Sequence, residues 1–137
     1  MKRIAFSMLL LSMAVGACGG PLKYMPKSAK APDADAVVIA DVKEADHNTR
    51  LTIKVEHLAP PSRISESAKH YVVWQRKDSG AQWSRVASLT YSEGDRTGKI
   101  VEATVPETAF DLQITAEEKP DVAAPSANLV IEQRVAK

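Results

Sequence analysis

The chain has 137 residues, of which 45% are hydrophobic and 26% charged, with 18 basic and 17 acidic side chains. This length fits one domain with a short extension, and the near balance of charge argues against a nucleic-acid-binding protein and against a polybasic membrane patch. With a single cysteine, an intrachain disulfide is excluded, and the domain must be held together by its core alone.

The N-terminal residues have the pattern of an export signal. Met1–Arg3 carries two basic side chains, Ile4–Val15 is apolar apart from two serines, and small residues precede Cys18. A basic start, a short apolar segment and a small-residue cleavage site are typical of a secretory signal peptide. The apolar run is about a dozen residues, whereas a membrane-spanning helix needs about 20. We therefore predict that residues 1–17 are a cleaved signal peptide.

The four residues Val15-Gly16-Ala17-Cys18 resemble the lipobox of bacterial lipoproteins. The resemblance implies diacylglyceryl transfer to the Cys18 thiol, cleavage before Cys18 and acylation of the new amine. Two or more acyl chains anchor a protein stably to a membrane. The alternative is an ordinary secretory signal with an incidental cysteine. Because enterobacterial lipoproteins kept at the inner membrane have Asp after the lipidated cysteine, Gly19 favours the outer membrane if the organism is Gram-negative.

Residues 18–35 contain three prolines among small and charged side chains and show no helical or strand period. This composition predicts a lipidated cysteine followed by a flexible tether. Tyr24 and Met25 could instead pack on the edge of the domain, which we expect to span residues 36–137. Loss of Lys2 and Arg3 with the signal peptide would lower the 18 basic residues to 16, against 17 acidic ones.

Residues 36–137 consist of short apolar or alternating segments separated by turn residues, with room for one helical turn in Ser62–Lys69. In Thr49–Leu58, for example, apolar residues alternate with polar ones, which indicates a half-buried strand. The predicted strands are Ala36–Val42, Thr49–Leu58, His70–Arg76, Gln82–Tyr91, Lys99–Val105, Ala109–Ala116 and Asn128–Val135. This pattern predicts an all-β protein, an Ig-like or fibronectin-type antiparallel β-sandwich of about seven strands.

Part of the predicted domain resembles a known family. Leu58–Pro61 with Lys69–Trp74, and Phe110–Glu117 with the Pro-containing loop that follows, are similar to the extracytoplasmic domain of anti-sigma-K-type regulators. The resemblance covers residues 50–135 and implies the same sandwich. We expect no sigma-factor regulation, because the sequence shows no sigma-binding helices, no His/Cys zinc motif and no spanning helix.

Few side chains are candidates for a binding site. Trp74 is expected in the sandwich core, as Trp is on the corresponding strand of Ig domains. Trp83 opens a strand and is expected to pack at the core edge, with a contribution to a binding patch as the alternative. His57 and His70 flank the Ala59–Lys69 loop and would come close if their strands paired. Their spacing matches no metal motif, so we expect no metal site and no cofactor.

Catalytic patterns are missing from the sequence. There is no Gly-x-Ser-x-Gly turn, Cys18 is assigned to lipidation, and the paired carboxylates Glu117-Glu118 fall in a predicted exposed loop. We therefore predict a non-catalytic protein with no small-molecule substrate and no nucleic-acid partner. Its partners would be the membrane, through Cys18, and an envelope protein bound by the loops Ala59–Lys69 and Glu117–Ser126 or by an edge strand. The alternatives are a purely structural subunit of an envelope complex and, more weakly, a small periplasmic hydrolase.

Overall fold

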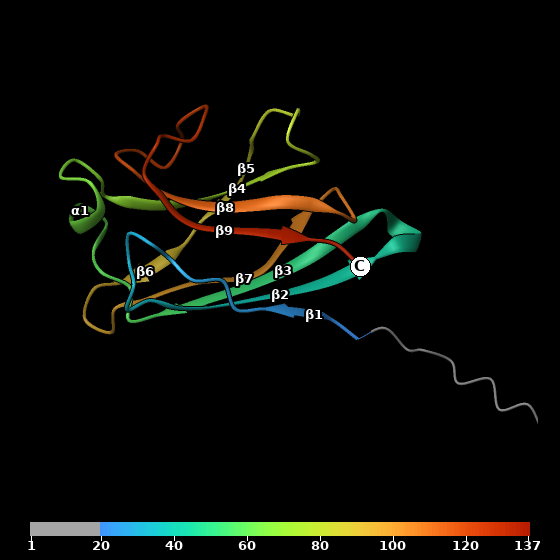
Figure 1. The fold of residues 1–137 in the computed structure, drawn as a ribbon, viewed down its shortest axis with the longest axis horizontal. Helices are drawn as coiled ribbons and strands as arrows, with labels where there is room; N and C mark the ends of the chain where they lie inside the picture. Colours follow the sequence, from blue (N-terminus) through green and yellow to red (C-terminus); the bar gives the residue numbers. More distant parts are fainter. Residues whose placement is uncertain (1–19) are drawn as a thin grey trace, which may run out of the picture.

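The computed structural model describes residues 20–137, which form nine strands, one α-helical turn and one 3-10 turn (Figure 1). In chain order these are β1 (Leu22–Tyr24), β2 (Asp35–Lys43), η1 (Glu44–Asp46), β3 (Asn48–Glu56), α1 (Pro61–Ile64), β4 (His70–Arg76), β5 (Ser84–Ser88), β6 (Thr90–Ser92), β7 (Thr97–Val105), β8 (Phe110–Glu117) and β9 (Leu129–Val135). Within this range neither helical segment has the length and apolarity to cross a bilayer. The predicted signal peptide, Cys18 and Gly19 lie outside the described residues.

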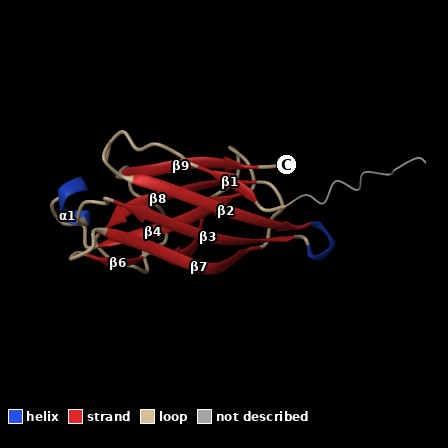
Figure 2. Cartoon of the chain, turned by 90° about the horizontal axis from the view of Figure 1, so that it is seen from below, coloured by secondary structure: helices blue, strands red, loops and turns tan. Residues whose placement is uncertain are grey.

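The strands form two antiparallel sheets that pack face to face. The five-stranded sheet has the order β1-β2-β3-β7-β6 and the four-stranded sheet the order β5-β4-β8-β9. Figure 1 shows the two layers, and Figure 2 views the five-stranded sheet from below. The predicted β-sandwich is confirmed; six of the seven expected strands are present as single strands, and the seventh is divided into two.

Alternating side chains of the two sheets meet in one hydrophobic core. On β3 the inward residues Leu51, Ile53 and Val55 are at most 1% exposed. Lys54 and Glu56, which alternate with them on the other face, are exposed. This is the period of two that the sequence of this strand predicted. The largest side chains in the core cluster are those of Tyr71, Phe110, Leu51, Ile53, Leu58, Leu112, Ile114 and Ile131.

The single strand predicted over Gln82–Tyr91 is divided between the two sheets. Its first part, β5, pairs with β4, and its second part, β6, pairs with β7. Leu89 lies between them, is 6% exposed, and its N–H donates to the Tyr71 carbonyl at 2.9 Å. The chain therefore changes sheet at Leu89, with the leucine side chain inserted into the core.

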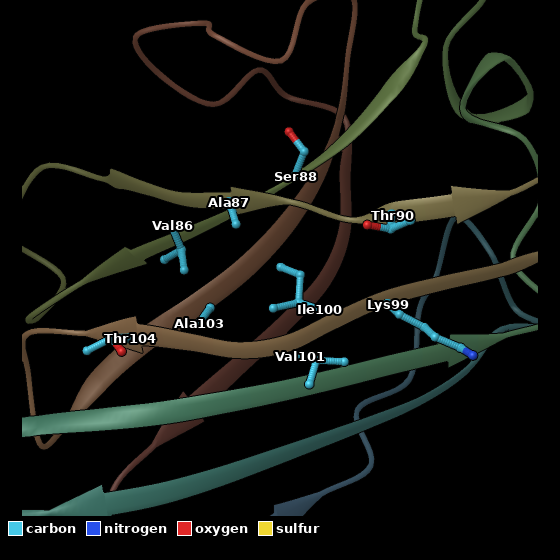
Figure 3. A pocket seen from close by; sticks show the side chains of 9 residues that line it. All are labelled: Val86, Ala87, Ser88, Thr90, Lys99, Ile100, Val101, Ala103 and Thr104. Atoms are coloured by element: carbon cyan, nitrogen blue, oxygen red, sulfur yellow. The ribbon is translucent and has the colours of Figure 1, made fainter.

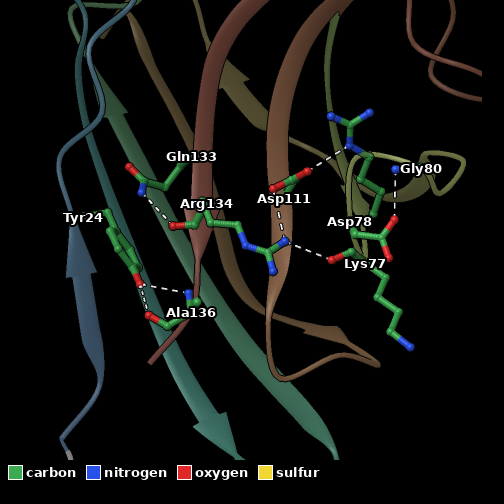
Figure 4. Close-up of polar contacts among 9 residues, drawn as sticks. Tyr24, Lys77, Asp78, Gly80, Asp111, Gln133, Arg134 and Ala136 are labelled. Carbon is green, nitrogen blue, oxygen red and sulfur yellow. Dashed lines mark hydrogen bonds and ion pairs between the residues drawn. The ribbon is translucent and has the colours of Figure 1, made fainter.

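The N-terminal part of the predicted tether belongs to the folded domain. Leu22, Lys23 and Tyr24 pair with β2 as strand β1. The Tyr24 hydroxyl donates to the Ala136 carbonyl at 3.1 Å and accepts from the Ala136 N–H at 3.2 Å, which ties β1 to the chain beyond β9 (Figure 4). The expected domain boundary at residue 36 is wrong, because the domain already begins at β1, although Met25 is exposed.

Candidate functional site

The two histidines that flank the Ala59–Lys69 loop are on different sheets. His57 follows β3 of the five-stranded sheet, whereas His70 begins β4 of the four-stranded sheet, so their strands do not pair. The Nδ1 atom of His57 lies 3.1 Å from the Asp35 carboxylate in an exposed ion-pair geometry. Within residues 20–137 no three His, Cys, Asp or Glu side chains are grouped to hold a metal ion. The idea that His57 and His70 meet through strand pairing is therefore wrong.

Trp74 is fully buried, but not in the core between the sheets. Tyr71 and Val73 of β4 belong to the core cluster, while Val72 and Trp74 on the opposite face of the strand do not. Because successive side chains of a strand alternate between faces, Trp74 lies on the outer face of the four-stranded sheet. The expected burial of Trp74 is confirmed and its expected place in the sandwich core is wrong.

A chain of hydrogen bonds connects Trp74 to the loop that covers it. The indole N–H donates to the Thr115 hydroxyl at 2.9 Å, and Thr115 donates to the Glu117 carboxylate at 2.7 Å. The same carboxylate oxygen accepts the Ser126 N–H at 2.7 Å. Asn128 closes the loop, because its carbonyl accepts the Ala116 N–H at 3.0 Å. The covering loop, which we define as residues 117–128, is thus fixed on the outer face, and Glu117 is buried rather than solvated as expected.

Trp83 is the half-buried aromatic residue of this face. The guanidinium carbon of Arg76 lies 4.3 Å from the centre of the Trp83 ring, which is a cation–π distance. Arg76 is held in turn by Asp111, whose second oxygen accepts from Arg134 at 3.2 Å (Figure 4). Arg134 also donates to the Lys77 carbonyl at 2.9 Å. The ladder Arg76–Asp111–Arg134 crosses β4, β8 and β9 and gives the Trp83 ring a fixed support.

A shallow hollow of about 430 Å³ lies beside Trp83. Its lining consists of Gln82 and Trp83 from the segment before β5 and Ala123, Ala124 and Pro125 from the covering loop. The covering loop is also linked to β5, because Arg85 donates to the Pro120 carbonyl at 2.6 Å. The structure therefore brings together two features that the sequence analysis had proposed separately, Trp83 and the loop Glu117–Ser126. The hollow is open and suits an apolar side chain better than an enclosed substrate.

A second groove, which sequence analysis missed, runs between the sheets along the edge formed by β5 and β7. It has a volume of about 630 Å³ and is lined mainly by small and aliphatic residues (Figure 3). It exists because β6 pairs with only Thr97, Gly98 and Lys99 of β7. The rest of β7 has a bulge, in which Val101 and Glu102 oppose a single residue of β3 and Glu102 has a positive φ of 58°. Bulges and charges of this kind discourage strand addition at an edge, so we do not assign this groove as the site.

Comparisons with known proteins identify no relative. No family model matches the chain, and neither a curated protein nor a solved structure is significantly similar to it. The resemblance to the anti-sigma-K-type extracytoplasmic domain stays a prediction.

Proposed function

We propose that this protein is a lipid-anchored, non-catalytic binding module of the bacterial cell envelope that uses the hollow beside Trp83 to bind another envelope protein. The observation that carries the proposal is the supported, half-buried Trp83 ring next to an alanine- and proline-lined loop. Rigid aromatic side chains with a polar tip are frequent anchors at protein interfaces. A partner that inserts an aliphatic or proline side chain beside Trp83 fits this surface.

The anchor is proposed from the lipobox-like residues that end at Cys18, with the outer membrane favoured in a Gram-negative cell. Leu22, the first residue of β1, is only four positions after Cys18. An extended chain covers at most about 3.5 Å per residue, so this segment reaches about 14 Å. A lipid on Cys18 would hold the β1 end of the sandwich close to the bilayer and leave α1, at the opposite end in Figure 1, directed away from it.

The anchor is tested by the intact mass of the protein isolated from membranes. We expect the wild type to have the mass of residues 18–137 plus a diacylglyceryl group and further acylation, and the Cys18→Ala variant to lack these lipids. An unlipidated product in both cases would leave a secreted β-domain and rule out the anchor.

The binding surface is tested in cells with a photo-crosslinking side chain at Ala124, inside the hollow. The matched control carries the same side chain at Ile39, an exposed residue of β2 in the other sheet. We expect a defined adduct from Ala124, none from Ile39, and loss of the Ala124 adduct when Trp83→Ala is added. Adducts that are equal at both positions, that persist without Trp83 or that never form would contradict the proposed surface.

A further inference from the structure

A second surface, at the α1 end of the sandwich, gathers arginines that the proposed function does not use. Ala59, Pro60, Arg63 and Arg96 line a hollow of about 550 Å³. A smaller hollow next to it shares Ala59 and Arg96 and adds Lys30, Asp33 and His57 among its lining residues. The two arginines come from separate segments, α1 and the turn between β6 and β7, and no carboxylate lines the larger hollow.

Neither arginine is neutralised by an acidic partner within residues 20–137. The ion pairs of this part of the chain involve other basic residues. The Arg96 guanidinium makes one long contact, from Nη2 to the His57 carbonyl at 3.4 Å, so most of its five N–H donors stay available. Two uncompensated guanidinium groups at one hollow attract an anion with more than one negative charge.

The floor of the hollow is fixed before any ligand arrives. The Tyr91 hydroxyl donates to the Leu58 carbonyl at 2.7 Å, and the Tyr71 hydroxyl donates to the Ala59 carbonyl. The Leu58 N–H donates to the Arg96 carbonyl at 2.8 Å, which joins the floor to the β6–β7 turn. Such preorganisation lowers the entropy that binding must remove.

The backbone at Arg96 would suit glycine better than arginine. Arg96 has φ of 52°, in the left-handed region that residues with a Cβ rarely adopt. His57, whose carbonyl it contacts, has φ of 54°. Strained positions of this kind concentrate at binding and catalytic sites, because there the side chain serves a purpose other than stability.

We propose that Arg63 and Arg96 form a binding site for a phosphate group. A phosphate monoester carries about −1.5 to −2 charges at neutral pH and several acceptor oxygens, which matches two guanidinium groups. A single carboxylate would leave one of the two cations without a counter-charge. The group can belong to a soluble ligand or to a lipid headgroup; because the α1 end would be directed away from the anchoring bilayer, such a lipid would belong to another membrane. The proposal is independent of the hollow beside Trp83.

The test is a titration of the purified full-length protein with inorganic phosphate, followed by NMR at constant ionic strength. We expect shifts in the His57–Arg63 segment and around Arg96, and about tenfold weaker binding in Arg63→Gln and Arg96→Gln, the effect of losing one charge-assisted contact. Arg50→Gln, which removes the same charge from an exposed position of β3, should bind like the wild type. Absent shifts, equal binding of acetate, or an equal loss in Arg50→Gln would overturn the phosphate site.

Arg96→Gly separates binding from folding, because glycine relieves the left-handed backbone. We expect an unchanged or higher unfolding midpoint together with weaker phosphate binding, whereas wild-type affinity in this variant would overturn the assignment of Arg96. Cosedimentation of the unlipidated Cys18→Ala protein with phosphatidylcholine vesicles, with and without phosphatidic acid, identifies the source of the group. Binding to phosphatidic acid that Arg96→Gln abolishes assigns a lipid headgroup, and phosphate shifts without vesicle binding assign a soluble ligand.

Discussion

Replacing Glu117 tests whether a buried carboxylate holds the covering loop on the outer face of the four-stranded sheet. Glu117 is 5% exposed, and its Oε1 accepts hydrogen bonds from the Thr115 hydroxyl and the Ser126 N–H, both at 2.7 Å. Hydrogen bonds to a charged group contribute about 1.5–3 kcal/mol each, and removal of the carboxylate also removes its own desolvation cost. We therefore expect Glu117→Ala to lower the free energy of unfolding by about 2–4 kcal/mol. Glu117→Gln keeps an acceptor oxygen and should cost about 1 kcal/mol.

The assay is urea unfolding followed by tryptophan fluorescence, with Glu118→Ala as the matched control. Glu118 is the exposed neighbour of Glu117, and its replacement should change the free energy of unfolding by less than about 0.5 kcal/mol. Limited proteolysis should cut the covering loop faster in Glu117→Ala than in either other variant, because Ser126 loses its acceptor. A Glu117→Ala protein as stable as the control, or a Glu117→Gln protein as unstable as Glu117→Ala, would refute the proposed role of the carboxylate.

Two further predictions concern packing and pH. A Cβ added at Gly98 would lie 3.0 Å from Leu89 Cδ1 and 3.2 Å from Leu58 Cδ2, so we expect Gly98→Ala to destabilise the protein by about 1–3 kcal/mol. The control is Gly94→Ala, whose added Cβ would meet nothing within 4 Å and which should be neutral or slightly stabilising. Thermal unfolding measures both effects. Burial raises the pKa of the Tyr71 hydroxyl in the folded protein, whereas in the unfolded chain it ionises near pH 10. Since only the unfolded state then releases this proton, stability is retained below about pH 10 and falls above it. Free energies of unfolding measured at successive pH values should show this decline, and a smaller one in Tyr71→Phe; a stability that does not change would contradict the burial.

The strands with strict alternation were predictable, because one face is buried and the other is in water. β3 is of this kind, and its inward residues Leu51, Ile53 and Val55 fall on the predicted face. β1 was not predictable, since Leu22–Tyr24 is too short to show a period and stands between prolines. Its pairing depends on the adjacent β2 and on the contact between Tyr24 and Ala136, far apart in sequence.

The position of Trp74 shows a limit of periodicity. Alternation along β4 places Val72 and Trp74 on one face and Tyr71 and Val73 on the other, but it cannot say which pair faces the other sheet. All four are fully buried, and Figure 1 shows the covering loop and the segment before β5 on the outer side of this sheet. The continuous run Tyr71-Val72-Val73-Trp74 was itself a signal, since strands buried on both faces lack polar alternation.

The candidate sites were only partly predictable, because each is formed by residues far apart in the sequence that meet only in the folded protein. Trp83 and the loop Glu117–Ser126 were selected by composition, but their meeting requires β4, β5 and β8 to be neighbours. Arg63 and Arg96 were not selected at all, because each is an isolated exposed arginine in the sequence. They line one hollow because the Leu58 N–H, a few residues before α1, donates to the Arg96 carbonyl and so holds the β6–β7 turn beside this segment.

The two outer faces of the sandwich differ in a way that favours the four-stranded sheet as the binding face. On the five-stranded sheet, exposed residues form local ion pairs, such as that between Lys54 and Glu56 at 2.7 Å, and the Lys54 ammonium lowers the pKa of Glu56 through this hydrogen bond. Such exposed pairs contribute little to stability. The four-stranded sheet is instead covered by an ordered loop whose backbone entropy must be offset by buried contacts. To keep the sandwich soluble, it would be enough for the covering loop to bury Trp74. Since Trp83 beside this loop stays half exposed, we look for the partner on the face of the four-stranded sheet.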